Sequence, residues 1–313
     1  MYKLYILARK NLKKIFLIFF AFSIMLACDN NEELVKPNNL SLQVGANSFT
    51  FTEYLPFENK PIEVFYFIPE DANPNLPILL SLHGMNRNGF NHRNSLISKA
   101  NQHKFIVIVP EFNDNYFTGG DGYNLANIFV DGDNPSTSTL NPNDEWTFAV
   151  LDPLFVYIKS LITNYSNSYH LIGFSAGGQL AHRTFIFNNS TYCNKTVAMS
   201  SGWYTTIDLS LDFPYGLKES PFDSINLATI FAKELIILVG ENDNDPDDPN
   251  LRRNSIVDDQ GDNRLDRADY FFANANNLAI EENLNFNWQK FIVPNAAHSL
   301  TPVSNFAIDH LYQ

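Results

Sequence analysis

Residues 171–178 read LIGFSAGG and predict the centre of the fold. An apolar strand at 169–172 runs into a G-x-S-x-G turn, and residues 179–187 follow with the pattern of a helix. Glycines suit such a bend because side chains there would crowd it. The turn exposes the Ser175 hydroxyl at the sheet edge, where the free N–H groups of the helix also point. This pattern favours a nucleophilic serine over a glycine-rich turn with an incidental serine.

A serine nucleophile needs a base to take its proton and an acid to orient that base. Behind a nucleophile elbow the partners follow in the order serine, acid, histidine. The apolar run 235–239 leads into GEND, which places Asp243 just past the carboxyl end of a strand. Sites of open α/β sheets gather at such strand ends. Several acids crowd this loop, so we predict Asp243 as the acid and keep Asp245 as the second choice.

Position selects the base among seven histidines. His298 lies in the loop after the last predicted strand, and it follows both Ser175 and Asp243 along the chain. The others are His83 at the end of an early strand, His92 and His103 in a helix expected at the surface, His170 before the elbow strand, His182 on the elbow helix and His310 at the chain end. We therefore predict His298 as the base, with an ordinary loop histidine as the alternative.

The acidic loop that follows residue 242 also permits a calcium interpretation. Residues 243–248 read DNDPDD, in which carboxylates alternate with other groups. The sequence lacks the glycine at the sixth position and the glutamate at the twelfth position that the standard calcium loop uses. We keep calcium as an alternative and predict a site without a metal.

Two main-chain N–H groups are predicted to bind the oxyanion that forms when an acyl carbon is attacked. One is that of Ala176, at the start of the elbow helix. The other is that of Met85, because the run 77–82 ends in His83 and Gly84 at the loop that follows an early strand. A plain strand-ending turn is the alternative for this second position.

Aromatic residues near these positions are predicted to line a substrate pocket. Trp203 and Tyr204 follow the strand 195–200, and Tyr116 and Tyr123 lie in a long polar stretch, 111–144. A stretch of that length without regular structure is usually functional, so we expect it to form part of the pocket wall. Core packing is the alternative role for all four aromatics.

The rest of the chain predicts one α/β domain over residues 40–313. Strands are expected at 40–44, 48–54, 62–68, 77–82, 105–109, 169–172, 195–200, 235–239 and 288–293, and helices at 91–103, 145–162, 179–187, 264–278 and 303–311. The first strands alternate apolar and polar residues, whereas the later ones are continuously apolar. We therefore expect a mostly parallel central sheet with helices on both faces and antiparallel strands at its amino-terminal side.

The amino terminus predicts export. Lysines at 10, 13 and 14 precede an uncharged run, 15–26, which is too short for a transmembrane span. MLAC at 25–28 resembles a bacterial lipoprotein signal, which implies cleavage after residue 27 and a lipid on Cys28. Residues 28–39 are polar and are predicted to be a tether. We expect a protein anchored by lipid to the bacterial cell envelope, with the outer surface as one location; a plain signal peptide is the alternative.

Charge and cysteine content limit the partners. Removal of residues 1–27 takes away five basic side chains and leaves 16 basic against 34 acidic residues, a net charge of −18. Such a surface repels nucleic acids and anionic membranes, so neither is an expected partner, apart from the lipid anchor. Cys193 would have no partner for a disulfide in the mature chain if Cys28 carries a lipid. The sequence does not predict an oligomeric state.

Taken together, the motifs resemble the α/β-hydrolase superfamily over nearly the whole mature chain. They are HG at 83–84, GFSAGG at 173–178, GWY at 202–204, GEND at 240–243 and VPNAAH at 293–298. The combination is similar to the esterase branch that includes polyhydroxybutyrate depolymerases and feruloyl or acetylxylan esterases. The resemblance implies hydrolysis of a small ester, a polyester or a glycan-linked ester by Ser175, Asp243 and His298, without a cofactor. A serine peptidase or amidase and a non-catalytic glycan-binding lipoprotein are the alternatives.

Overall fold

A single sheet of eight strands organises the computed structural model, which describes residues 41–221 and 226–313. Its strands are β1 (Gly45–Phe51), β2 (Ile62–Ile68), β3 (Ile78–Leu82), β4 (Ile106–Glu111), β5 (Tyr169–Phe174), β6 (Cys193–Met199), β7 (Glu234–Gly240) and β8 (Gln289–Val293). The spatial order is β1-β2-β4-β3-β5-β6-β7-β8. Strands β3 to β8 run parallel, whereas β2 pairs antiparallel with both β1 and β4. The predicted fold class is confirmed.

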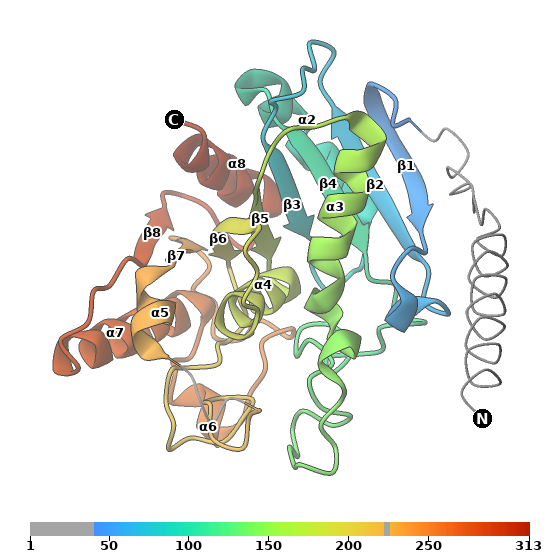
Figure 1. Ribbon diagram of the computed structural model, residues 1–313. Coiled ribbons are helices and arrows are strands. Elements are labelled where there is room, and N and C mark those ends of the chain that lie inside the picture. Colours follow the sequence, from blue (N-terminus) through green and yellow to red (C-terminus); the bar gives the residue numbers. More distant parts are fainter. Residues whose placement is uncertain (1–40, 222–225) are drawn as a thin grey trace, which may run out of the picture. The chain divides into compact units, whose positions relative to one another are not determined.

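Helices cover both faces of the sheet (Figure 1). The longer ones are α2 (Gly89–His103), α3 (Leu151–Ile162), α4 (Ala176–Phe187), α7 (Arg264–Glu281) and α8 (Leu300–Leu311). Apolar residues of α3, α4 and α7 pack in one core cluster, and those of α2 and α8 pack in another. Successive residues of a strand point to opposite faces, so Ile237 of β7 joins the first cluster and Leu238 the second. Because both faces are covered, the central strands are mostly apolar.

Several predicted boundaries were wrong. Residues 41–44 form no strand, and the antiparallel edge begins only at Gly45. The helical pattern that begins at residue 145 contains two short 3₁₀ turns, η2 (Asn143–Glu145) and η3 (Thr147–Val150), before α3 starts. The short helices α5 (Leu227–Ala232) and α6 (Ser255–Asp258) were not predicted, because each offers too few turns for a periodic pattern.

Residues Leu42–Gln313 form one compact unit. The predicted signal peptide, the lipidation site at Cys28 and the tether lie outside the described residues. No helix in the described part of the chain is long and apolar enough to cross a membrane.

Candidate active site

The turn between β5 and α4 has the geometry of a nucleophile elbow. Ser175 adopts φ +57° and ψ −115°, and its N–H donates to the Met199 carbonyl of the neighbouring strand at 2.9 Å. The glycines around it are required by close backbone contacts: a Cβ at Gly173 would lie 2.1 Å from the Gly177 carbonyl oxygen, and one at Gly177 would lie 2.2 Å from the Leu82 carbonyl oxygen. Ser175 is thereby held at the carboxyl edge of the sheet.

Three side chains from distant parts of the sequence converge at this edge. The His298 Nε2 lies 3.1 Å from the Ser175 Oγ, and the His298 Nδ1 lies 2.8 Å from the Asp243 Oδ2. A carboxylate can only accept, so the Nδ1–H donates to Asp243, and Nε2 is left to accept the serine proton. This arrangement matches the nucleophile, base and orienting acid of a serine hydrolase.

The backbone of two adjacent loops fixes the acid. The Asp243 N–H donates to the Gly240 carbonyl at 3.1 Å, and the Asn242 N–H donates to the Ala296 carbonyl in the histidine loop at 2.8 Å. Asp243 is buried, whereas Asp245 is exposed and its carboxylate accepts the Asp247 N–H at 2.9 Å. The structure therefore brings Asp243, and not the second choice Asp245, to the histidine.

A buried arginine lies behind the acid. Arg264, the first residue of α7, is 3.4 Å from the Asp243 Oδ1 and 2.6 Å from the Asp248 Oδ2 through its Nη1. Burial acts to raise the pKa of Asp248, but hydrogen bonds from the Asn250 N–H and the Arg264 guanidinium outweigh it and lower that pKa. In the loop 243–248, for which calcium was the alternative, Asp243 contacts His298 and Arg264, Asp248 contacts Arg264, and Asp245 accepts a backbone N–H. In the described residues, no three His, Cys, Asp or Glu side chains are grouped to hold a metal ion.

The two predicted oxyanion donors face the same cleft as Ser175. Ala176 opens α4, so its N–H has no acceptor inside the helix. Met85 lies in a turn that the Arg87 N–H closes by donating to the Gly84 carbonyl at 3.1 Å. Within the described chain, neither the Met85 nor the Ala176 N–H donates to a loop or turn carbonyl. Both residues line the cleft with Ser175 and His298.

The cleft has a volume of about 1370 Å³, and polar and apolar groups contribute to its wall in similar measure. Trp203 lines it, as predicted. The prediction was wrong for Tyr123 and Tyr204, which are fully buried in the core, and Tyr116 is exposed but is not among the lining residues. The stretch 111–144 does contribute to the wall, through Asn113, Asp114, Gly119, Gly120 and Asn124.

Further lining residues escaped the sequence analysis. They are Arg87, His92, Gln179, Arg252 and Arg264. His92 belongs to α2, which was expected to expose it, but the residue is buried, and its Nε2 lies 2.7 Å from the Ser81 Oγ. Burial lowers the pKa of His92 to about 4. No local pattern marks these residues, because the fold alone brings them to the cleft.

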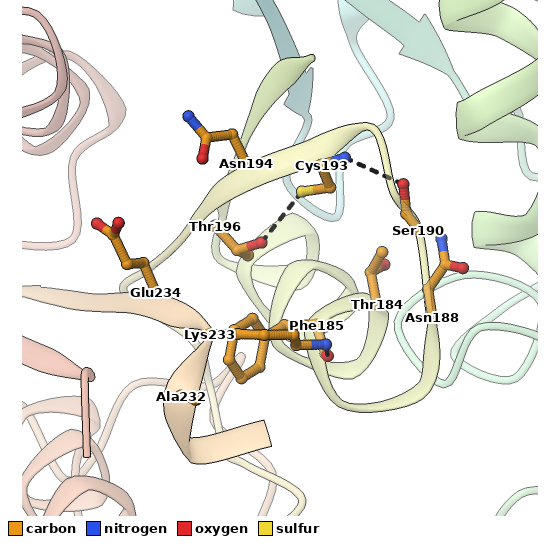
Figure 2. A pocket seen from close by; sticks show the side chains of 10 residues that line it. All are labelled: Thr184, Phe185, Asn188, Ser190, Cys193, Asn194, Thr196, Ala232, Lys233 and Glu234. Carbon is orange, nitrogen blue, oxygen red and sulfur yellow. Dashed lines mark hydrogen bonds between the residues drawn. The ribbon is translucent and has the colours of Figure 1, made fainter. Parts of the chain in front are cut away.

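A second cavity lies at the opposite edge of the sheet, where β6 and β7 begin (Figure 2). Its volume is about 190 Å³, and its wall includes Ser190, Cys193, Thr196 and Lys233. The Ser190 Oγ accepts the Cys193 N–H at 3.0 Å, and the Cys193 Sγ lies 3.4 Å from the Thr196 Oγ1. Burial raises the pKa of Cys193 to about 11, so its thiol stays protonated near neutral pH.

The fold and the site can be compared with known proteins. Poly(aspartic acid) hydrolase-1 from Sphingomonas sp. KT-1 is 33% identical, covers 87% of this chain and 100% of its own, and superposes with a TM-score of 0.81. A poly(3-hydroxybutyrate) depolymerase from Bordetella parapertussis is 26% identical. It covers 86% of this chain and 91% of its own, and superposes with a TM-score of 0.79. An S-formylglutathione hydrolase from Agrobacterium tumefaciens shares the fold. It is 14% identical, covers 87% of this chain and 95% of its own, and superposes with a TM-score of 0.54.

No protein-family model matches the sequence, and no curated protein sequence matches it. The relatives above nevertheless support an enzyme of the hydrolase class. With 33% identity over most of its length, and with the sheet order and elbow described here, the chain belongs to the α/β-hydrolase superfamily.

Proposed function

We propose that the protein is a serine hydrolase of carboxylic esters. The observation that carries this proposal is the convergence of Ser175, His298 and Asp243 at 3.1 Å and 2.8 Å on the wall of one open cleft. Such an arrangement activates a hydroxyl that is otherwise a weak nucleophile.

The reaction would proceed in two halves. The Ser175 Oγ forms a bond to the ester carbonyl carbon while its proton passes to the His298 Nε2. The Met85 and Ala176 N–H groups bind the carbonyl oxygen as it becomes negative, and Asp243 stabilises the charged imidazole. The carbon–oxygen bond to the alcohol then breaks, and the alcohol leaves with the histidine proton. Water repeats these steps on the acyl-enzyme, which releases the acid and restores Ser175.

A serine amidase is the second candidate, and one comparison favours it. The 33% identical relative is named for poly(aspartic acid), whose residues are joined by amide bonds, whereas the 26% identical relative is named for a polyester. Both names describe polymers, and an open cleft accepts a long chain better than a closed pocket does. We therefore propose a polymer or its fragments as the substrate.

The test is hydrolysis of a short-to-long nitrophenyl ester series, poly(3-hydroxybutyrate) and poly(aspartic acid) by the chain without residues 1–28. Ser175→Ala is measured in parallel. We expect ester turnover that is lost in the variant. Turnover of the polyamide alone would favour the amidase, and turnover that survives in Ser175→Ala would refute the serine mechanism.

We also propose that the protein is an exported lipoprotein attached through Cys28. The basic start, the apolar run 15–26 and MLAC at 25–28 support this. Expressed in a bacterial host, the wild-type chain should fractionate with membranes and incorporate labelled palmitate. Cys28→Ala should do neither, and an unchanged distribution would contradict the proposal.

A further inference from the structure

One buried tyrosine links the turn that carries Met85 to the long segment 111–144. The Tyr123 ring stacks on the His83 ring, with centroids 4.8 Å apart and planes 22° apart. The Arg87 guanidinium carbon lies 4.2 Å from the centroid of the same ring. Tyr123 therefore contacts the residues on either side of the turn 84–86, which makes this ring part of the support of the turn.

Hydrogen bonds tie the same two residues to the same segment. The Tyr123 hydroxyl donates to the His83 carbonyl at 2.6 Å. The Phe112 N–H donates to the His83 Nε2 at 3.0 Å, and the Arg87 Nη1 donates to the Phe112 carbonyl at 2.5 Å. A further bond runs from the Arg87 Nη2 to the Gly119 carbonyl at 2.8 Å. Both ends of the turn are thus held by one neighbouring segment.

His83 acts in this arrangement as a neutral acceptor. Because its Nε2 accepts from Phe112, the ring proton lies on Nδ1, which donates to the Gly84 carbonyl at 3.0 Å. Burial, helped by the neighbouring charge of Arg87, lowers the pKa of His83 to about 3. The contacts around the turn therefore keep one protonation state over the pH range in which an esterase would work.

The turn lies directly against the elbow, so its position matters for the chemistry. A Cβ at Gly84 would be 3.8 Å from the Ser175 Cβ. Oxyanion donors act only when they are fixed at the place where charge develops. Displacement of a donor by a fraction of an ångström is enough to reduce the rate.

We propose that Tyr123 and Arg87 are positioning residues that hold the Met85 N–H in place for the oxyanion formed at Ser175. The inference rests on the proposed serine mechanism. The proposed role requires no contact with the substrate: Tyr123 is fully buried, and Arg87 lines the cleft but donates through its guanidinium to two backbone carbonyls of the supporting segment.

The test uses Tyr123→Phe in the full chain, because this change keeps the ring and removes only the hydroxyl. The readout is the rate constant with which a fluorophosphonate labels Ser175, since that reaction needs the oxyanion donors but no known substrate. We expect labelling about tenfold slower, below the 100- to 1000-fold loss of an entire donor. For any ester that is turned over, kcat should fall by a similar factor while KM stays unchanged.

Tyr169→Phe is the matched control. Tyr169 is equally buried, and its hydroxyl donates to the Asp152 Oδ1 at 2.8 Å near the other edge of the sheet. It should lower Tm as much as Tyr123→Phe does and leave labelling unchanged. Arg87→Met should also slow labelling, and Arg87→Lys should restore part of the rate because it can still donate to a carbonyl.

The outcomes separate the two proposals. A wild-type chain whose Ser175 is not labelled would count against the serine mechanism itself. A labelled wild type with an equally fast Tyr123→Phe would overturn the positioning role and leave the mechanism standing. A slow Tyr123→Phe that is matched by an equally slow Tyr169→Phe would also overturn it, because general destabilisation would then explain both.

Discussion

The two edges of the sheet each carry a cavity and a potential nucleophile, yet they differ in what surrounds it. At the amino edge, Cys193 lies beside Thr196 and Ser190, and burial raises the pKa of its thiol to about 11 (Figure 2). At the carboxyl edge, Ser175 faces the free imidazole nitrogen of His298. A thiol is intrinsically the better nucleophile, so we expect the neighbouring groups, and not the atom type, to decide which of the two side chains reacts.

The topology explains why the edges differ. The parallel strands end at the carboxyl edge, so the loops after β5, β7 and β8 meet there and bring three functional side chains together. The start of α4 adds unpaired N–H groups at the same place. Among the described residues that line the cavity at the amino edge, none begins a helix, and the Cys193 Sγ lies near the Thr196 hydroxyl and the Lys195 carbonyl.

Replacement of each potential nucleophile in turn tests this comparison most strongly. Ser175→Ala should reduce kcat by up to about 10⁶-fold, because triad members act as a unit. Cys193→Ser should leave kcat and KM within twofold, since the thiol lies at the other edge of the sheet. Nitrophenyl ester kinetics on both variants, with circular dichroism to check folding, would measure this. A large loss in Cys193→Ser with native folding would contradict the assignment of chemistry to one edge.

The choice of acid gives the next largest effect. Asp243→Asn should lower kcat about 10⁴-fold, because an amide can donate to Nδ1 and so favour the wrong histidine tautomer. Asp245→Asn should be nearly neutral, since its carboxylate accepts only a local N–H. The pair is compared by ester turnover at fixed pH. If Asp245→Asn proves the damaging change, Asp243 is not the acid.

Substitution of Arg264 tests whether a residue behind Asp243 is needed to hold this carboxylate in place. Arg264→Gln should destabilise the fold by about 3 kcal/mol, because the buried Asp243 and the partly buried Asp248 lose their partner, and should lower kcat/KM about 10- to 100-fold by shifting Asp243. Arg264→Lys should fall between this variant and the wild type.

Arg253→Gln is the surface control for this prediction. Arg253 pairs with Asp258 and Asp262 at 3.0 Å and 3.1 Å in exposed surroundings. Its loss should cost less than about 1 kcal/mol. Urea unfolding and ester kinetics measure both effects, and equal losses in Arg264→Gln and Arg253→Gln would show that burial of the first pair is unimportant.

A further prediction concerns the pH dependence of the stability. Burial lowers the pKa of His83 to about 3 and those of His92 and His170 to about 4, against about 6.5 in the unfolded chain. Above pH 6.5 both states are neutral at these sites. As the pH falls from 6.5 to 4, the unfolded chain binds more protons, so the stability should fall, by at most about 1.4 kcal/mol per histidine for each pH unit.

Urea unfolding at pH 7.5, 6 and 5 would measure this slope. His170 lies at the amino edge, and its Nδ1 has no hydrogen-bond partner in the described part of the chain, so His170→Gln should be tolerated. The variant should have a shallower pH dependence in the acidic window. An unchanged slope would mean that His170 does not contribute to it.

Sequence patterns predicted the fold because most of its elements leave a clear signal, such as the continuous apolar run of β7 and the long periodic pattern of α7. The elbow was also predictable, since a Cβ at Gly173 or Gly177 would clash with a backbone carbonyl, and the required glycines leave a local signature in the sequence. Ser175 and His298 could be selected by their order along the chain and by their place after a strand. The structure brings them together with Asp243, as predicted.

The remaining errors concern the direction in which a side chain points. Tyr123 and Trp203 both lie in irregular segments and both are buried, but only Trp203 is part of the cleft wall. Irregular segments have no periodic pattern, so their sequence does not show which side chains point into the core and which point into the cleft. Arg264 is missed for another reason. It begins α7, whereas its carboxylate partners, Asp243 and Asp248, lie in the loop after β7, so no local sequence pattern joins them.

The backbone conformation of Ser175 has a consequence for the history of such chains. A residue with a side chain at φ +57° and ψ −115° is strained by about 1–3 kcal/mol, and glycine would adopt this conformation with little cost. Stability alone would therefore favour glycine at this position. In a descendant that no longer needs the proposed reaction, replacement of Ser175 by glycine would therefore raise the stability of the fold.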